Sequence, residues 1–139
     1  MREKITVQTV IGAPIQKVWE YFTDPKHVVA WNNASDDWTT PHAENNLVPG
    51  GTFSYRMEAK DGSRGFDFGG VYDEVVELQR LTYMMGDGRK VIVVFAPIGD
   101  QTELTETFEA ESQNSVEVQR HGWQAILNNF KRYVESIPL

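Results

Sequence analysis

The chain has 139 residues, which fits one domain and is short for two. Hydrophobic residues make up 40% and charged residues 24%, so a core can form, and collagen-like, coiled-coil and low-complexity architectures are excluded. The formal net charge of -7 argues against nucleic acid and against an anionic membrane as partners.

The chain contains no cysteine, which excludes disulfides, thiolate nucleophiles and thiolate metal ligands. Its first residues alternate between polar and apolar types, unlike a signal peptide, and no later stretch approaches the ~20 apolar residues that cross a bilayer. We therefore expect a cytoplasmic protein.

The first third of the chain predicts a strand followed by two short helices. Residues 3–11 carry β-branched side chains at alternate positions, as in a strand. A helix is predicted from Pro14 to about Phe22, because apolar residues recur at spacings of three and four. Segment 24–31 opens with an N-cap aspartate and a proline, which predicts a second helix.

Hydrophobic periodicity fails from Asn32 to Gly51, where Asn, Asp, Ser, Thr and Pro dominate. This composition predicts a loop of about 20 residues, and loops of that length in a compact domain are often functional. We expect it to act as a lid over a ligand.

The middle of the chain predicts five strands in an antiparallel meander. The pair Gly69-Gly70 in the second of them indicates a bend or a bulge. Run 91–95 is apolar on both faces, which predicts a central strand covered on both sides. The five strands are expected at 53–59, 66–72, 81–85, 91–95 and 102–108.

A long amphipathic helix is predicted from about residue 115 to 135. Segment 114–117 has the N-cap and third-position glutamate of a capping box, and Pro138 marks the helix end. The expected fold is α+β: a curved antiparallel sheet of about six strands packed on this helix, with two short helices after the first strand. A helix ~10 Å wide cannot cover a sheet ~25 Å across, so a space should remain between them.

The order of these elements resembles the START-like, helix-grip superfamily, also called SRPBCC. Within it, the chain is similar to proteins related to the activator of the heat-shock protein 90 ATPase. The matching motifs are Ala13-Pro14 with Val18-Trp19, Thr23-Asp24-Pro25 followed by Trp31, Pro49-Gly50-Gly51 with Phe53, and Gly122-Trp123 with Leu127-Asn128 and Phe130. The resemblance implies a single START-like domain over residues 1–139. It also implies a role among hydrophobic-ligand carriers, cyclases, hormone receptors or stress-response co-chaperones.

Glu106 is the candidate catalytic residue. It shares strand parity with Leu104 and Phe108, so in a regular strand its carboxylate points into the apolar space. Desolvation there would raise its pKa and make it a general acid or base, or an anchor for a ligand hydroxyl or amine. The alternatives are that a bulge turns it to solvent or that an arginine pairs with it, the candidates being Arg56, Arg80 and Arg89.

No motif predicts a metal or a cofactor. His27, His42 and His121 lack the spacing of metal ligands, and all three are expected at the surface. His42 near Asp36 and Asp37 resembles an Asp-oriented base, although a solvated loop histidine is the commoner outcome. No Gly-x-Ser-x-Gly or phosphate-loop motif is present.

Aromatic and methionine side chains on the inward faces either fill the core or line a pocket. The residues expected to line a ligand pocket are Trp31, Trp38, Phe53, Tyr55, Met57, Phe66, Phe68, Tyr83, Met85, Phe95, Glu106, Trp123, Leu127 and Phe130. Tyr72 is a weaker candidate, because a predicted bend precedes it.

Three functions remain open on this sequence. We favour binding of a small hydrophobic or amphipathic molecule between sheet and helix. The alternatives are a cyclase, isomerase or lyase that uses Glu106, and a co-chaperone or stress-response domain that binds a protein partner through its acidic surface or an exposed sheet face.

Overall fold

The computed structural model describes residues 2–138; Met1 and Leu139, which the expected domain 1–139 includes, lie outside the described residues. In chain order the elements are β1 (Lys4–Ile11), α1 (Ile15–Thr23), α2 (Pro25–Trp31), β2 (Trp38–Asn45), β3 (Thr52–Ala59), β4 (Gly65–Val76), β5 (Arg80–Met85), β6 (Lys90–Ile98), β7 (Gln101–Glu109) and α3 (Val116–Ser136).

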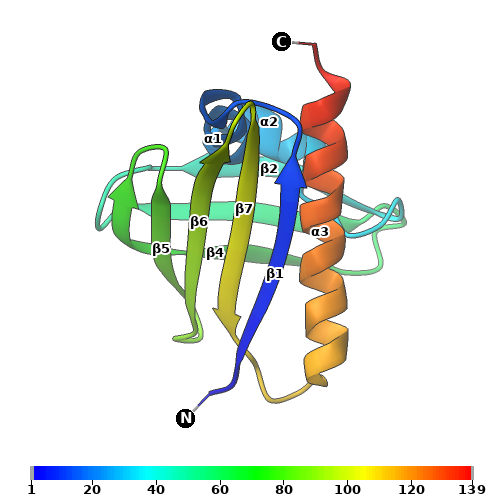
Figure 1. Cartoon of the computed structure of the whole chain (residues 1–139). Helices are drawn as coiled ribbons and strands as arrows, with labels where there is room; N and C mark the ends of the chain where they lie inside the picture. Colours follow the sequence, from blue (N-terminus) through cyan, green and yellow to red (C-terminus); the bar gives the residue numbers. More distant parts are fainter. Residues whose placement is uncertain (1, 139) are drawn as a thin grey trace.

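The strands form one curled antiparallel sheet that grips α3 (Figure 1). Its order is β1-β7-β6-β5-β4-β3-β2, so strands β2 to β7 form a meander and β1 pairs with β7 at the far edge. The expected α+β helix-grip fold is confirmed. Among residues 2–138, no helix has the length and apolar character needed to cross a membrane.

The expected continuous loop at 32–51 is wrong, because residues 38–45 within it form the edge strand β2. This strand pairs with β3 from Trp38 to Asn45 and brings the sheet to seven strands. It has no hydrophobic alternation because it packs at an edge, and its pairing shifts register between Thr39 and His42, around Pro41. A proline is tolerated in an edge strand at such an irregularity, where no ladder hydrogen bond is required of it.

The expectation of a strand covered on both faces is also wrong. On β6, Val91, Val93 and Phe95 are buried, but Ile92 is 41% exposed and Val94 is 39% exposed. The described helices leave these outward side chains uncovered, so the outer face of the sheet reaches solvent.

The irregularity in β4 lies after Gly69-Gly70 instead of at it. The register with β5 shifts between Tyr72 and Glu74. Gly70 faces inward opposite Phe53 and Met85, and a Cβ there would lie 2.5 Å from the Met84 carbonyl oxygen and 3.3 Å from the Phe53 ring. The glycine therefore provides room for a neighbouring strand and an aromatic ring.

Helix α3 begins one residue later than the sequence indicates. Its N-cap is Ser115, whose hydroxyl accepts a 3.1 Å hydrogen bond from the Val118 amide. Near its end, Lys131 Nζ donates to the Val10 carbonyl and the Glu135 carboxylate accepts from the Gly12 amide. These bonds attach the helix to the edge formed by β1 (Figure 1).

Candidate functional site

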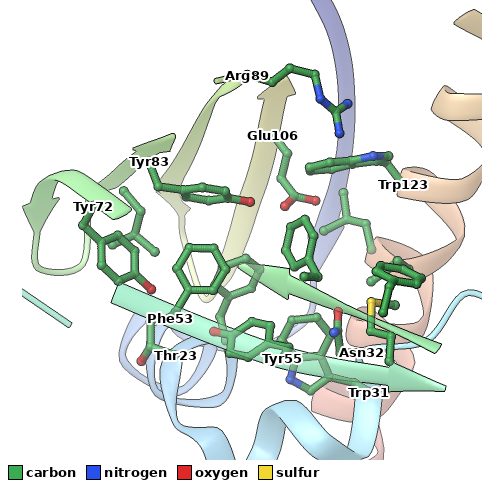
Figure 2. A pocket seen from close by; sticks show the side chains of 17 residues that line it. Thr23, Trp31, Asn32, Phe53, Tyr55, Tyr72, Tyr83, Arg89, Glu106 and Trp123 are labelled. Carbon is green, nitrogen blue, oxygen red and sulfur yellow. The ribbon is translucent and has the colours of Figure 1, made fainter. Parts of the chain in front are cut away.

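A cavity of about 280 Å³ lies between α3 and the inner face of the sheet. One water needs only ~10–15 Å³ on this measure, so the space is large enough for a small organic molecule. Nine of the 17 lining residues are aromatic (Figure 2). The lining residues are Phe22, Thr23, Trp31, Asn32, Phe53, Tyr55, Met57, Phe66, Phe68, Tyr72, Leu81, Tyr83, Arg89, Glu106, Trp123, Ile126 and Leu127.

The cavity exists because α3 covers only part of the sheet. The helix packs mainly on β1 and on the short helices, and strands β3, β4 and β5 curl around the space that is left. Phe66, which is 48% exposed, lines the cavity as well as the surface. The cavity therefore reaches solvent near the β3–β4 hairpin.

Glu106 lies in the cavity wall, on β7, and is only 8% exposed. Its cross-strand neighbours are Val7 on β1 and Val93 on β6, so neither offers a polar group. Within residues 2–138 no side chain or backbone group forms a hydrogen bond with its carboxylate. Burial raises its pKa from 4.5 to about 7.

None of the three candidate arginines forms an ion pair with Glu106. Arg56 pairs with Glu58 and Asp67, and Arg80 pairs with Glu74. Arg89 lines the same end of the cavity, but its Nε donates to Asp87 at 2.7 Å. Its Nη1 donates to the Glu109 carbonyl at 3.3 Å. The Arg89 charge is therefore already balanced by a neighbouring carboxylate.

Tyrosine hydroxyls extend the polar part of the cavity. Figure 2 shows the Tyr83 hydroxyl pointing toward the Glu106 carboxylate. Burial raises the pKa of Tyr83 well above its usual value, and the nearby Glu106 charge raises it further. The Tyr83 hydroxyl forms no hydrogen bond within the described chain, so it is free to bind a ligand.

A second pair of tyrosines lies on β3 and β4. Burial raises the pKa of Tyr55, and the neighbouring Tyr72 raises it further. The Tyr72 hydroxyl donates to Asn45 Oδ1 at 2.7 Å, and the Asn45 amide donates to the Thr23 carbonyl at 2.8 Å. Burial raises the pKa of Tyr72 to about 12. Both phenols therefore stay protonated at neutral pH.

Most of the side chains expected in the pocket do line the cavity, and four do not. Phe95 and Phe130 pack in the core around Phe22, and Met85 is buried near Arg89. Trp38 lies on the edge strand, against Phe66.

Seven lining residues are absent from the expected set: Phe22, Thr23, Asn32, Tyr72, Leu81, Arg89 and Ile126. Strand parity or the helix stripe could have identified Leu81, Ile126 and Tyr72. Thr23, Asn32 and Arg89 lie at helix or strand ends, where periodicity gives no orientation.

The histidines lie away from the cavity. His42 is exposed and pairs with Glu44 at 3.2 Å, so the Asp-oriented base is not formed. The expectation that His27 is a surface residue is wrong: its side chain is 13% exposed, stacks on Tyr21 and bonds the Tyr133 hydroxyl at 2.7 Å. In the part of the chain described, residues 2–138, no cluster of His, Asp and Glu is arranged to hold a metal ion.

A curled antiparallel sheet around a long C-terminal helix, with a cavity between them, defines a helix-grip protein. Residues 12–135 match the family model described as Activator of Hsp90 ATPase homolog 1-like protein. The chain therefore belongs to this family.

Solved structures with similar folds include close relatives. An AHSA1-like protein from Aeromonas hydrophila is 46% identical, with a TM-score of 0.91 over 96% of this chain and 93% of that chain. A protein from Cytophaga hutchinsonii is 51% identical, with a TM-score of 0.83 over 96% and 92%. A protein from Nitrosomonas europaea, at 19% identity and a TM-score of 0.81 over 96% and 94%, shares the fold. Among curated proteins, none matches the chain.

Proposed function

We propose that the protein binds a small hydrophobic or amphipathic molecule in the cavity between the sheet and α3. The observation that carries this proposal is an aromatic-walled space of about 280 Å³ that holds an unpaired carboxylate and an unpaired phenol. A well-packed interior has few voids larger than a water, and buried polar groups normally have partners. A bound ligand would fill the void and supply those partners.

A thermal-shift series tests the proposal with naphthalene, laurate, cholate and 1-anilinonaphthalene-8-sulfonate (ANS). A ligand that binds only the folded state raises the melting temperature with concentration, by about 2.7 kcal/mol of stability at 100 times its Kd. We expect at least one probe to give this increase. No shift with any probe contradicts the proposal.

A matched pair of variants locates the binding. Ile126 lines the cavity, whereas Asn128 is exposed on the same helix. We expect Ile126→Trp to abolish the shift, because the indole blocks the space, and Asn128→Trp to retain it. An equal shift in both variants places the ligand outside the cavity.

A second candidate function is proton-transfer catalysis. It is favoured by the Glu106 carboxylate, whose pKa of about 7 suits a general base at neutral pH, and by the adjacent Tyr83 hydroxyl as hydrogen-bond donor. A cyclase, isomerase or lyase reaction would use this pair. Glu106→Gln preserves the shape and removes the base, so unchanged turnover of any substrate found contradicts this candidate.

The family description favours a third candidate, a cytoplasmic stress-response domain that binds a chaperone-type partner. Segment 100–117 contains six acidic residues and no basic residue, and the five other than Glu106 lie outside the cavity, which suits a basic partner surface. A cavity that binds no probe, together with a measured complex with an Hsp90-type chaperone, would favour this candidate over ligand binding.

A further inference from the structure

The Glu106 carboxylate faces the cavity without a hydrogen-bond donor from within residues 2–138. The Glu106 carboxylate oxygens and the Tyr83 hydroxyl, which can donate or accept, form no hydrogen bond within residues 2–138. An ionised carboxylate has only acceptor sites, and it is strongly destabilised in an apolar space unless a donor or a positive charge reaches it. The part of the cavity beside the Glu106 carboxylate therefore suits a ligand group that donates hydrogen bonds or carries a positive charge.

We propose that the cavity selects a compact aromatic molecule that carries a protonated amine, with the rings against the aromatic wall and the ammonium on Glu106. This inference rests on the proposed ligand-binding function and names the class of ligand. The ammonium would donate to the Glu106 carboxylate and to the Tyr83 oxygen.

The walls of the cavity favour a cation that is attached to a ring system. Phe53 packs edge-on against Tyr83 at 4.8 Å, and Phe68 packs edge-on against Trp123 at 6.0 Å. Aromatic side chains that line a cavity can pack against an aromatic ligand, and ring faces also attract cations. The net charge of -7 adds a long-range attraction for cationic ligands.

The titratable groups that line the cavity near Glu106 do not neutralise its carboxylate, so a ligand cation can pair with it. Tyr83, Tyr55 and Tyr72 remain neutral at physiological pH because burial raises the pKa of each phenol. Arg89 is the cationic group among the lining residues, and Asp87 pairs with it at 2.7 Å. From α3, the lining side chains are Trp123, Ile126 and Leu127, none of which titrates.

Ligand binding should therefore be coupled to the protonation of Glu106. Only the ionised carboxylate forms the ion pair, so the apparent affinity scales with the ionised fraction. Since the pKa of Glu106 is about 7 in the empty cavity, amine binding should strengthen at least tenfold between pH 5.5 and pH 8.

Four probes with one ring system test the inference: 2-naphthylmethylamine, 2-naphthol, naphthalene and 2-naphthoate. Their Kd values are measured by NMR titration of the full chain, for the native protein, Glu106→Gln and Glu103→Gln. Glu103 lies on the same strand and faces outward, so its variant controls for loss of one negative charge.

We expect the amine to bind at least tenfold more tightly than each of the other three probes at pH 8. Glu106→Gln should weaken the amine at least tenfold and leave naphthalene within about twofold, whereas Glu103→Gln should change neither. When the Kd of the amine is measured as a function of pH, binding should strengthen at least tenfold between pH 5.5 and pH 8. Glu106→Gln should remove this pH dependence.

Other results would overturn the amine inference, and they differ from the result that would also overturn ligand binding. If naphthalene binds as tightly as the amine, or naphthol or naphthoate binds most tightly, the cavity takes ligands but does not select amines. If none of the four binds while ANS, laurate or cholate does, the amine inference also fails alone. If no probe in either set binds, both proposals fail.

Discussion

Glu106 shows how one residue can oppose the stability of the domain around it. The carboxylate lies between Val7 and Val93 and has no hydrogen-bond partner in the described chain. An apolar residue at this position would remove the desolvation cost, and local rules are most often broken at functional sites. The buried acid is therefore the strongest functional indication in the molecule.

The pKa of Glu106 predicts a pH dependence of stability. In the folded chain the pKa is about 7, compared with 4.5 for the free side chain, so the folded state binds more protons between these values. The free energy of unfolding should fall as pH rises from about 4.5 to about 7, by roughly 3 kcal/mol for this group. Denaturant unfolding at pH 5, 6, 7 and 8 measures the slope.

Two variants isolate this contribution. Glu106→Gln should be more stable than the native protein at pH 8 and lose this part of the slope, since the amide does not ionise. Glu103→Gln, on the same strand, should retain it. A native-like slope in Glu106→Gln would show that other groups cause the pH dependence.

At the scale of an element, α3 combines strong anchoring with one weak position. Ser115 caps its start, and Lys131 and Glu135 attach its last turns to β1. Gly122 lies inside the helix, and a Cβ built there has no heavy atom within 4 Å. Neither packing nor a positive φ angle requires glycine at this position.

Gly122→Ala should therefore stabilise the protein. Alanine is favoured over glycine in a helix interior by about 1 kcal/mol, because it restricts the unfolded backbone. We expect the melting temperature to rise by a few degrees in calorimetry, without loss of ligand binding. Gly70→Ala is the contrasting variant, since its Cβ would meet the Met84 carbonyl oxygen at 2.5 Å, and it should destabilise. A loss of stability in Gly122→Ala would indicate a constraint on the helix that packing does not show.

At the scale of the whole molecule, the fold separates a packed half from an open half. Around β1, β7 and the end of α3, Ile5, Phe108, Phe130 and Val134 are completely buried. Toward β3, β4 and β5 the sheet curls away from the helix, and the cavity remains. The open half loses packing contacts that a filled interior would gain.

Filling the cavity should raise stability and weaken ligand binding. Leu81 is buried and lines the cavity, whereas Leu104 is buried outside it. We expect Leu81→Phe to keep or increase the free energy of unfolding and to weaken naphthalene binding at least tenfold. Leu104→Phe, in a packed region, should cost ~1–3 kcal/mol. Equal destabilisation of both variants in denaturant unfolding would mean that the cavity cannot accept a ring.

The amino-acid sequence was sufficient to predict the elements whose periodicity reflects burial on one face. Strand 102–108 and the apolar stripe of the last helix follow from such patterns, and parity correctly placed Leu104 and Phe108 inward. Strand β2 could not be predicted, because an edge strand with a proline and few apolar residues has no periodic signal. Thr23, Asn32 and Arg89 were not recognised as lining residues, because they lie at helix or strand ends, where periodicity gives no orientation.

The linear pattern thus specified the helix-grip architecture, since alternation and helical stripes are local consequences of which face is buried. Whether a space survives beneath α3 is a property of three-dimensional packing. It depends on the curl of the sheet, on the anchoring of the helix to β1 and on which side chains reach the interior. Residue spacing contains none of these quantities, so the sequence could predict that a space should remain, while its size, its lining and the unpaired state of Glu106 emerged only from the folded chain.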